Sequence, residues 1–325
     1  MIDRNQIEHP VSEAFKRFQA EFEPALQSEV ETIRSAVETI RRSNGKHIRP
    51  LLLLLTAKAC GRVPEASVRA AVLLELLHTA SLIHDDVVDE TKQRRGALSL
   101  NAIHDNRVAV LVGDFILADS LMRALQLENL QIVGIMAKLC HDMAEGEIKQ
   151  LENADKVILT EMDYFVVLEK KTAALLASCT QIGAITAGAS AEVQKTAGTF
   201  GKLLGYCFQI RDDIFDYFED SRTGKPSGND LREGKVTLPL LYALEKASPA
   251  EKAPYMEMLL KKNFTPDHIA ALLRFAREKG GIEYAEARMN EYREQAARII
   301  RSTLPASEAR DSLLLLADYL VERSR

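Results

Sequence analysis

The chain has 325 residues, of which 46% are hydrophobic and 27% are charged, and its formal net charge at pH 7 is −5. This composition is typical of a soluble globular protein, and the lack of a basic run argues against a nucleic-acid partner. No apolar stretch reaches the roughly 20 residues that span a bilayer, and the N-terminus lacks the apolar core of a signal peptide. We therefore expect a cytoplasmic protein.

Proline spacing predicts long helices. The ten prolines leave a stretch of 161 residues without proline between Pro64 and Pro226, and it is rich in Ala, Leu, Glu and Lys at helical spacing. Helix-start signals follow at Thr160, Ser248 and Thr265. The four cysteines are far apart and form no CxxC pair, which is typical of reduced thiols. We expect one all-α domain that covers residues 1–325.

The first predicted helix covers residues 11 to 41, and a basic segment follows it. Gly45 opens this segment, and Lys46 and Arg49 flank the start of a leucine-rich helix. Two cations beside the free N–H groups of a helix N-terminus favour phosphate binding. A basic loop before a helix is also often simply solvated, so this pattern alone leaves both interpretations open.

The most informative stretch runs from residue 78 to residue 96. It contains Asp85, Asp86 and Asp89, and at 3.6 residues per turn Asp85 and Asp89 lie above one another on one helix face. Two carboxylates 4 Å apart repel by about 1 kcal/mol in water and by about 4 kcal/mol at an effective dielectric constant of 20. Such a pair beside a pocket favours a bound cation.

The same triplet returns 127 residues later as Asp212, Asp213 and Asp216. Chance alone gives two such triplets in on the order of one chain in a thousand of this length. Solvated acidic helix ends are the plain alternative. The interpretation that we prefer is two facing carboxylate clusters that bind hard divalent metal ions.

Two further motifs lie close to the first triplet. Glu75 and His78 form an E-x-x-H pair, but a di-iron bundle needs this motif twice and the sequence has it once. His78 is either a buried structural histidine or a donor to a ligand oxygen. Arg94 and Arg95 either neutralise the aspartates or, like the guanidinium groups of many phosphate sites, bind a diphosphate.

Later motifs supply additional candidates for a ligand site. Glu145-Gly146-Glu147 contains a glycine that would let a ligand chain approach the backbone. Lys171 lies in an apolar helix, where a lysine usually extends to water; the alternative is that it faces a cavity together with the Thr172 hydroxyl. Gln209 precedes the second aspartate triplet. Lys225 and Lys235 lie in a glycine-rich segment without P-loop spacing, and we expect it to close over a bound diphosphate.

These motifs together resemble the trans-isoprenyl diphosphate synthases, the polyprenyl synthetase family. The resemblance covers roughly residues 40 to 245 and includes Gly45 to Pro50, His78, both aspartate triplets, Arg94 to Gly96, Lys171-Thr172, Phe208-Gln209 and Gly224-Lys225. It implies long, mostly antiparallel helices around a deep central cavity, usually in a homodimer, with the two aspartate motifs facing each other at the cavity mouth.

The resemblance also implies a mechanism. An allylic diphosphate would be bound through three Mg²⁺ ions, with Asp85, Asp89 and Asp212 as direct ligands among the six aspartates. The resemblance also implies that Arg94, Lys171 and Lys225 bind the allylic diphosphate with the support of Gln209, and that Lys46, Arg49, His78 and Arg95 bind isopentenyl diphosphate. Our interpretation of the residues adds Thr172 and Lys235 to the allylic site. Departure of diphosphate would give an allylic cation that the isopentenyl double bond attacks.

Product length depends on the residues just before Asp85. In the resembling family, aromatic side chains at these positions stop growth at short products, whereas this chain has Ala80 and Ser81. We therefore expect a long-chain synthase such as a heptaprenyl or octaprenyl diphosphate synthase, whose product makes transient membrane contact. A short-chain farnesyl or geranylgeranyl synthase, a class I terpene cyclase and a non-catalytic subunit of a heteromeric synthase are the alternatives.

Overall fold

The computed structural model describes residues 3–42, 45–94, 97–154, 159–219, 227–262 and 264–322. Within these ranges the chain is helical apart from turns and one hairpin of two-residue strands, β1 (Gln93–Arg94) and β2 (Ala97–Leu98). The elements before residue 160 are α1 (Arg4–Glu8), η1 (His9–Val11), α2 (Ser12–Ala25), α3 (Glu31–Arg42), α4 (Ile48–Ala59), α5 (Glu65–Val88), α6 (Leu100–Ile103), α7 (Asn106–Gln126) and α8 (Leu130–Ala154). The later elements are α9 (Glu161–Leu168), η2 (Glu169–Ala173), α10 (Ala174–Ala187), α11 (Ala191–Asp216), α12 (Asn229–Arg232), α13 (Leu238–Lys246), α14 (Pro249–Lys261), α15 (Pro266–Glu278), α16 (Gly281–Thr303) and α17 (Glu308–Glu322). The expected all-α class is confirmed.

Local signals in the sequence define several helix ends. The Thr160 side chain accepts a hydrogen bond from the backbone N–H of Asp163 at the start of α9, and the Asp163 carboxylate accepts one from the backbone N–H of Thr160. Ser248 and Glu251 form the same capping box at α14. Each box satisfies N–H groups that a helix start leaves without partners. The predicted helix starts at these residues are therefore confirmed.

The expected single helix over residues 11 to 41 is wrong. The structure has two helices there, α2 and α3, separated by residues 26 to 30. Pro24 lies in the last turn of α2, where its ring removes a backbone donor and disfavours continuation of the helix. The Ser28 hydroxyl then accepts the Val30 N–H in the turn. The break lets α2 pack against α4 and α5.

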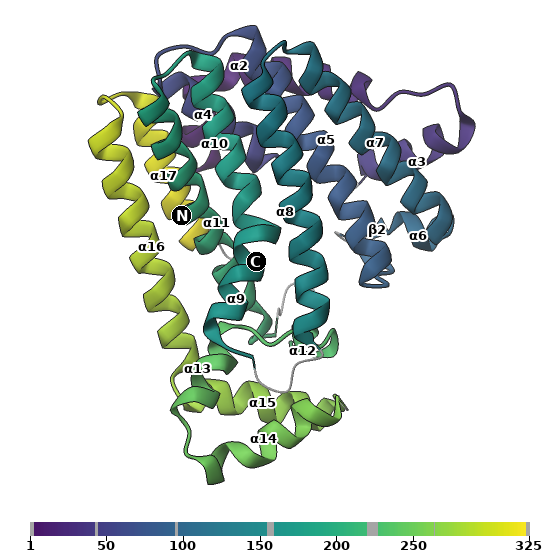
Figure 1. Cartoon of the computed structure of the whole chain (residues 1–325), viewed down its shortest axis with the longest axis vertical. Helices are drawn as coiled ribbons and strands as arrows, with labels where there is room; N and C mark the ends of the chain where they lie inside the picture. The colour runs from purple at the N-terminus through teal and green to yellow at the C-terminus, as the bar shows by residue number, and fades with distance from the viewer. Residues whose placement is uncertain are drawn as a thin grey trace.

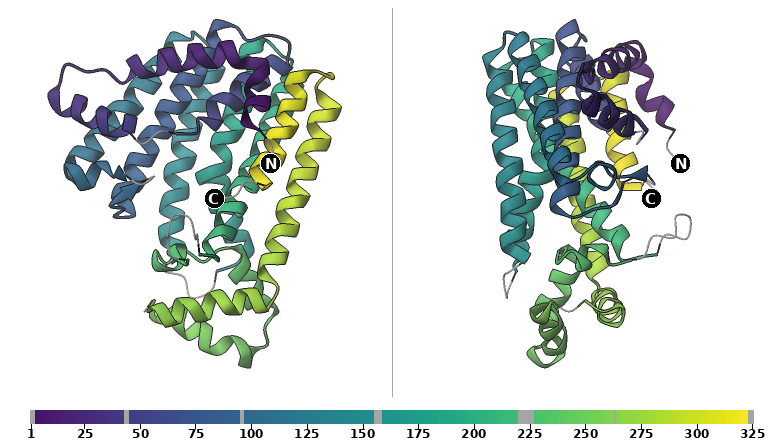
Figure 2. Two further views of the ribbon diagram at one scale, coloured as in Figure 1. Left: turned by 180° about the vertical axis from the view of Figure 1, so that it is seen from behind. Right: turned by 90° about the vertical axis from the view of Figure 1, so that its right-hand side faces the viewer.

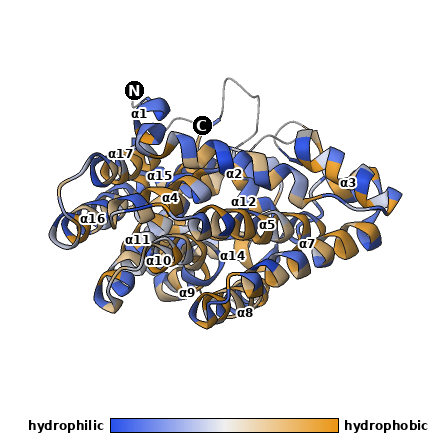
Figure 3. Ribbon diagram, turned by 90° about the horizontal axis from the view of Figure 1, so that it is seen from above, coloured by the Kyte–Doolittle hydropathy of each residue, from blue (hydrophilic) through white to orange (hydrophobic). Residues whose placement is uncertain are grey.

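The long helices stand side by side and alternate in direction along the chain (Figure 1). The α10 helix packs against α11 and α4, α5 packs against α7, and α11 also contacts α16. The N-terminal helices lie on one side of this bundle (Figure 2), and α2 crosses it when seen from above (Figure 3). Because α5 and α11 run in the same direction, their C-terminal ends lie at the same end of the bundle.

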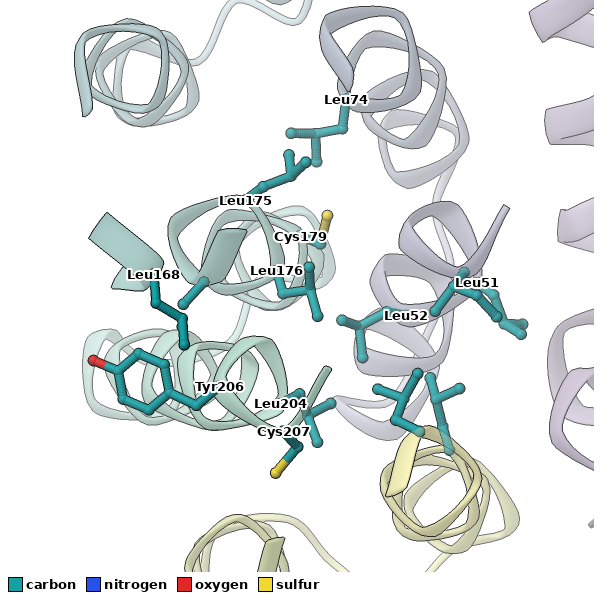
Figure 4. Close-up of a cluster of buried hydrophobic side chains, with 14 of the residues drawn as sticks. Leu51, Leu52, Leu74, Leu168, Leu175, Leu176, Cys179, Leu204, Tyr206 and Cys207 are labelled. Carbon is teal, nitrogen blue, oxygen red and sulfur yellow. The ribbon is translucent and has the colours of Figure 1, made fainter. Parts of the chain in front are cut away.

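Leucines of α4 form the middle of the core. Leu51 to Leu55 are fully buried, and each buried leucine contributes about 1.5–3 kcal/mol relative to an exposed one. Figure 4 shows Leu52 of α4, Leu176 of α10 and Leu204 of α11 pointing toward one another. The cysteines form no disulfide, as expected. This packing fixes the relative positions of the helices that carry the candidate site.

By length and composition α5 is the one helix among the described residues that could cross a membrane, but 72% of its apolar window is buried inside the protein. A core helix has this property because neighbouring helices cover it on all sides. The α5 helix therefore serves as the central wall of the bundle, with Asp85 to Asp89 at its end.

Candidate active site

Both aspartate triplets lie at helix C-termini. Asp85 and Asp86 are in the last turn of α5 and Asp89 caps it, while Asp212, Asp213 and Asp216 occupy the last turn of α11. Helix C-termini carry partial negative charge, so six carboxylates there raise the negative potential further. Cations must balance this charge.

A polar cavity of about 250 Å³ lies between the two helix ends. We call it the acidic chamber, and its charged lining consists of Asp85, Asp89, Arg94, Lys171, Asp213, Asp230 and Lys235. The chamber thus joins residues of α5, η2 and α11 that are far apart in the sequence. Three of its seven charged residues are cations, so it fits an anion bound together with a metal ion.

A second cavity of about 650 Å³, which we call the apolar chamber, continues from the acidic chamber. The two share Leu82, Asp85, Arg94, Lys171, Thr172 and Gln209. Away from this junction the apolar chamber is lined mainly by small and apolar side chains, among them Leu77, Ala80, Leu117, Met143 and Leu175. A charged head and a long hydrocarbon tail are the ligand parts that match the two chambers.

The Asp85 carboxyl group has a perturbed pKa. Burial raises this pKa to about 6, and the neighbouring carboxylates of Glu147 and Asp89 raise it too, against the opposing effect of Lys171. The ionised form is therefore disfavoured in the protein alone. A divalent cation beside Asp85 would remove this penalty, so the residue fits a metal ligand.

Asp86 has a different environment from Asp85. The Nε atom of Arg94 lies 2.8 and 2.9 Å from the two Asp86 carboxylate oxygens, and Nη2 lies 2.6 Å from Oδ1. Asp86 also accepts a bond from Asn101 through its backbone carbonyl. Both side-chain oxygens thus hold Arg94 at the junction of the chambers, in the fork geometry of strong guanidinium–carboxylate pairs.

Asp213 is the centre of a buried hydrogen-bond network. The Tyr164 hydroxyl donates to its Oδ2 at 2.6 Å, and the Gln209 amide donates to Oδ1 at 2.8 Å. Gln209 in turn accepts from the Thr172 hydroxyl at 2.9 Å. Burial raises the pKa of Asp213 to about 7, although both hydrogen bonds act in the opposite direction. The network positions Gln209 and Thr172 at the junction.

The Asp216 carboxylate binds the backbone at the start of α12. Its Oδ1 accepts the backbone N–H of Asn229 at 3.0 Å, and its Oδ2 accepts the N–H of Asp230 at 3.0 Å. Gly228 precedes them with a φ of 76°, in the left-handed region that glycine adopts without strain. Asp216 thus anchors α12, which carries Asp230 to the acidic chamber.

Lys171 lines the junction and lies where the helix changes its pitch. Residues Glu169–Ala173 form a π-helix, a feature that is frequent at functional sites. Lys171 Nζ lies 2.5 Å from Glu147 Oε2, and Lys170 Nζ lies 2.6 Å from Glu145 Oε2. The two lysines therefore bind the two glutamates of α8.

Gly146 explains how these pairs form. A Cβ atom at this position would lie 2.8 Å from the Lys170 Cβ and 3.1 Å from the Lys171 nitrogen. The glycine therefore permits close contact between α8 and η2. Our expectation that it would admit a ligand chain is wrong, because the adjacent helix fills that space.

Lys235 lines the acidic chamber and pairs with two carboxylates. Its Nζ lies 3.2 Å from Asp89 Oδ1 and 2.5 Å from Glu233 Oε2. Burial by itself lowers the pKa of Lys235, but the two carboxylates outweigh it and the pKa is raised. The lysine is thus charged beside Asp89. The expected mobile flap also included Lys225, which lies outside the described residues.

A third cavity of about 230 Å³, the N-terminal cavity, adjoins the junction through His78, Leu82 and Arg94. Gly45 and His47 line it from the basic segment, and Arg49 lines the apolar chamber near Phe208, with its guanidinium carbon 5.9 Å from that ring. Lys46 is exposed beside them. Arg95 lies outside the described residues.

Possible metal ligands also occur elsewhere. His141, Asp142 and Glu145 place ligand atoms within 4.8 Å of one another on α8. His141 is exposed, and Lys138 and Lys170 already bind Asp142 and Glu145 at 2.6 Å. This group is separate from the two aspartate triplets and resembles a solvated surface network.

Sequence reasoning missed several residues that build the site. Tyr164 binds Asp213, and the buried carboxyl of Asp230 has a strongly raised pKa. Glu147 was named only as a neighbour of Gly146, and its ion pair with Lys171 was not expected. Asp230 stood in the glycine-rich segment that we identified, but its spacing from the triplets gave no signal. Tyr164 gave no signal either, because it lies in an ordinary apolar helix.

An all-α bundle with aspartate clusters at the mouth of a deep apolar cavity defines the isoprenoid synthase class. Residues 30–275 match the polyprenyl synthetase family model, and the chain belongs to this family. It is therefore a trans-prenyltransferase, in a family that binds diphosphate through divalent metal ions.

Two relatives and one solved structure illustrate the similarity. Octaprenyl diphosphate synthase of Haemophilus influenzae is 38% identical over 302 residues, which cover 92% of this chain and 91% of the relative. Heptaprenyl diphosphate synthase component 2 of Geobacillus stearothermophilus is 35% identical over 96% of this chain and 97% of its own. The crystal structure of geranylgeranyl pyrophosphate synthase from Bacteroides thetaiotaomicron is 40% identical, with a TM-score of 0.86 and coverage of 98% and 99%.

Proposed function

We propose that this enzyme condenses an allylic diphosphate with successive isopentenyl diphosphate units to a long-chain all-trans polyprenyl diphosphate and releases diphosphate. The observation that carries the proposal is the continuity of the charged acidic chamber with the 650 Å³ apolar chamber. The diphosphate occupies the first, and the growing chain extends into the second. The name of the Haemophilus relative, an octaprenyl diphosphate synthase, supports the long product.

Arg94 and Lys171 bind the allylic diphosphate at the junction of the chambers. Asp86 holds the guanidinium group of Arg94, and Glu147 holds the ammonium group of Lys171, so both cations are positioned before the substrate arrives. Thr172 and Gln209 line the same junction, and the hydrogen bond between them holds both side chains in position. Lys235 and, from the segment outside the described residues, Lys225 complete the cationic surroundings.

Asp85, Asp89 and Asp212 are the direct metal ligands that we propose. In each of the other three aspartates, Asp86, Asp213 and Asp216, both side-chain oxygens accept hydrogen bonds. We therefore propose that Asp86 positions Arg94, that Asp213 positions Gln209 and that Asp216 positions α12. The three proposed metal ligands are the direct ligands that the resemblance implies among the six aspartates. Carboxylate ligands without thiols favour Mg²⁺, and three ions are the proposed number. When bound, Mg²⁺ neutralises the diphosphate and makes it a better leaving group.

In the reaction, the bond between C1 of the allylic substrate and the diphosphate oxygen breaks, and both electrons leave with the diphosphate. Arg94 and Lys171 stabilise the charge that accumulates on it. The double bond of isopentenyl diphosphate then forms a new carbon–carbon bond to C1, and a proton passes from the condensed product to the released diphosphate. Lys46, Arg49 and His78 hold isopentenyl diphosphate, and His78 lines both the N-terminal cavity and the apolar chamber. We assign Arg95, which lies outside the described residues, to the same substrate.

We propose a homodimer formed through α7 and α8. On α7, Leu111, Met122 and Leu125 are 67%, 54% and 61% exposed, and helical spacing places them on one face. Ile148 and Leu151 of α8 are also exposed. An apolar face of this kind favours a protein partner. A heteromeric complex is the alternative, since the Geobacillus relative is named component 2 of its synthase.

We further propose that residues 1–325 form one domain in the cytoplasm. Buried side chains from α1 to α17 belong to one hydrophobic cluster, which supports the single domain. The burial of α5 supports a protein whose only membrane contact is transient, during product release.

The test is condensation by the purified protein with Mg²⁺, labelled isopentenyl diphosphate and a geranyl or farnesyl starter, followed by chromatographic sizing of the products. We expect products of C30 to C50, loss of turnover in EDTA and recovery on addition of Mg²⁺. Full turnover in EDTA would refute the metal assignment. Products that end at C20 would support a geranylgeranyl synthase, the activity named for the Bacteroides structure.

A further inference from the structure

Glu75 is a buried carboxylate that the proposed reaction does not use. It lies on α5 ten residues before Asp85, and its side chain is 8% exposed. Its Oε1 lies 2.9 Å from His47 Nδ1, while Oε2 has no hydrogen-bond partner among the described residues. A buried carboxylate costs free energy unless it is paired, so the bond to His47 offsets the cost of burying Glu75.

His47 itself has an unusual backbone conformation. Its φ of 44° and ψ of 42° lie in the left-handed region, which is uncommon for residues other than glycine and persists where the surroundings hold it. Its ring lies edge-on to Phe18 at 5.5 Å and to Phe22 at 5.6 Å between centroids. Glu75 of α5 and two phenylalanines of α2 therefore fix this imidazole.

The fixed imidazole determines the course of the basic segment. His47 is the residue before α4, and its carbonyl accepts the first helical N–H, from Leu51, at 3.2 Å. Lys46 precedes it and Arg49 lies in the first turn of α4. The turn at His47 thus sets the direction of Lys46 relative to Arg49.

We propose that Glu75 is a positioning residue for isopentenyl diphosphate, acting through His47 on the segment that carries Lys46 and Arg49. The inference rests on the proposed function, since it assumes that this segment binds the second diphosphate. Glu75 lines the N-terminal cavity together with His47 and His78. Because its carboxylate would repel a diphosphate, the role that we propose for it is indirect. Its effect is instead to keep the two cations at a fixed separation.

Steady-state kinetics of three variants test the proposal. Glu75→Leu removes both charge and acceptor, Glu75→Gln keeps an acceptor for His47, and His47→Gly keeps the left-handed backbone without the ring. We expect Glu75→Leu and His47→Gly to raise the KM for isopentenyl diphosphate about tenfold, the effect of losing a hydrogen bond to a charged group. Glu75→Gln should have a smaller effect. The kcat at saturating isopentenyl diphosphate should stay within about threefold, and the KM for the allylic substrate should not change.

The chain supplies matched controls. His9 Nδ1 and Glu308 Oε1 form a similar pair at 2.7 Å on the surface, so Glu308→Gln should leave both KM values unchanged. Lys262 has a φ of 48° at the end of α14, and Lys262→Gly controls for a glycine at a left-handed position.

The outcomes separate the two proposals. An unaltered enzyme that does not condense the two diphosphates refutes the proposed function. An active enzyme whose Glu75→Leu and His47→Gly variants keep the KM for isopentenyl diphosphate within about twofold refutes the positioning role, as does an equal rise in both KM values. If Glu75→Leu does not fold, as circular dichroism would reveal, His47→Gly decides, because the side chain of His47 is near the surface and 19% exposed.

Discussion

Replacing Ala80 by phenylalanine should shorten the product. Ala80 is 1% exposed and lines the apolar chamber together with Ser81, whose hydroxyl donates to the His78 carbonyl at 2.8 Å. Along α5, Ser81 lies about 6 Å and Ala80 about 7.5 Å from Asp85 at 1.5 Å per residue. A prenyl unit spans roughly 5 Å. Side chains at these positions therefore flank the first units beyond the diphosphate.

A phenylalanine side chain at residue 80 or 81 would place a rigid ring, which buries about 150–250 Å², across the path of the growing chain. We expect Ala80→Phe and Ser81→Phe to make C15 or C20 products in place of C30 to C50 products. Leu77 lies about 12 Å from Asp85 on the same helix and also lines the chamber. Leu77→Phe should therefore stop growth at a later unit.

The assay uses labelled isopentenyl diphosphate with a geranyl starter, and the products are dephosphorylated and sized by chromatography. The initial condensation rate serves as the control, because the C15 and C20 products that we expect from both variants still require the first condensation of the geranyl starter. Identical product ladders for the unaltered enzyme, Ala80→Phe and Ser81→Phe would show that the chain does not extend along this face of α5.

Three further predictions concern the site and its scaffold. Asp85→Asn should lower kcat at least about 100-fold, and Asp86→Asn about tenfold, because Asp86 acts through a cation; equal losses would contradict this division. In the metal-free protein, the melting temperature should fall between about pH 4 and pH 7, because the folded-state pKa of Asp213 is raised from its ordinary value of 3.8 to about 7, and the stability that is fully present below the ordinary pKa is lost as the pH rises to the folded-state pKa. Asp213→Asn should flatten that profile in calorimetry, and a rise with pH would oppose it. Gly146→Ala should destabilise the fold by about 1–3 kcal/mol in urea unfolding, whereas Gly134→Ala on the same helix, where an added Cβ meets no atom within 4 Å, should be neutral or stabilising.

The sequence by itself determined the helical class and the chemical character of the site. Helix periodicity and the capping pairs at Thr160 and Ser248 act over a few residues, so local reasoning finds them. The aspartate triplets were also readable, because their spacing within one helix turn has a direct electrostatic meaning. The break within residues 11 to 41 is also local, because Pro24 lies in the last turn of α2 and the helical periodicity on either side of it does not reveal the interruption.

Only the tertiary structure decided which groups the individual aspartates bind. Asp85 and Asp86 are neighbours in the sequence, yet one lines both chambers and the other binds Arg94. Tyr164 binds Asp213 from 49 positions away, and the backbone that binds Asp216 begins 13 positions away. Hydrogen bonds and burial depend on distances in space, which a linear spacing rule does not contain.

The same reason applies to Glu75 and Gly146. In the sequence Glu75 was the first residue of an incomplete metal motif, and Gly146 was an opening for a ligand. In the folded chain Glu75 binds an imidazole 28 residues away, and Gly146 lies against a π-helix. Composition and periodicity specify which faces are buried, but the packing of one helix against another decides which atoms meet.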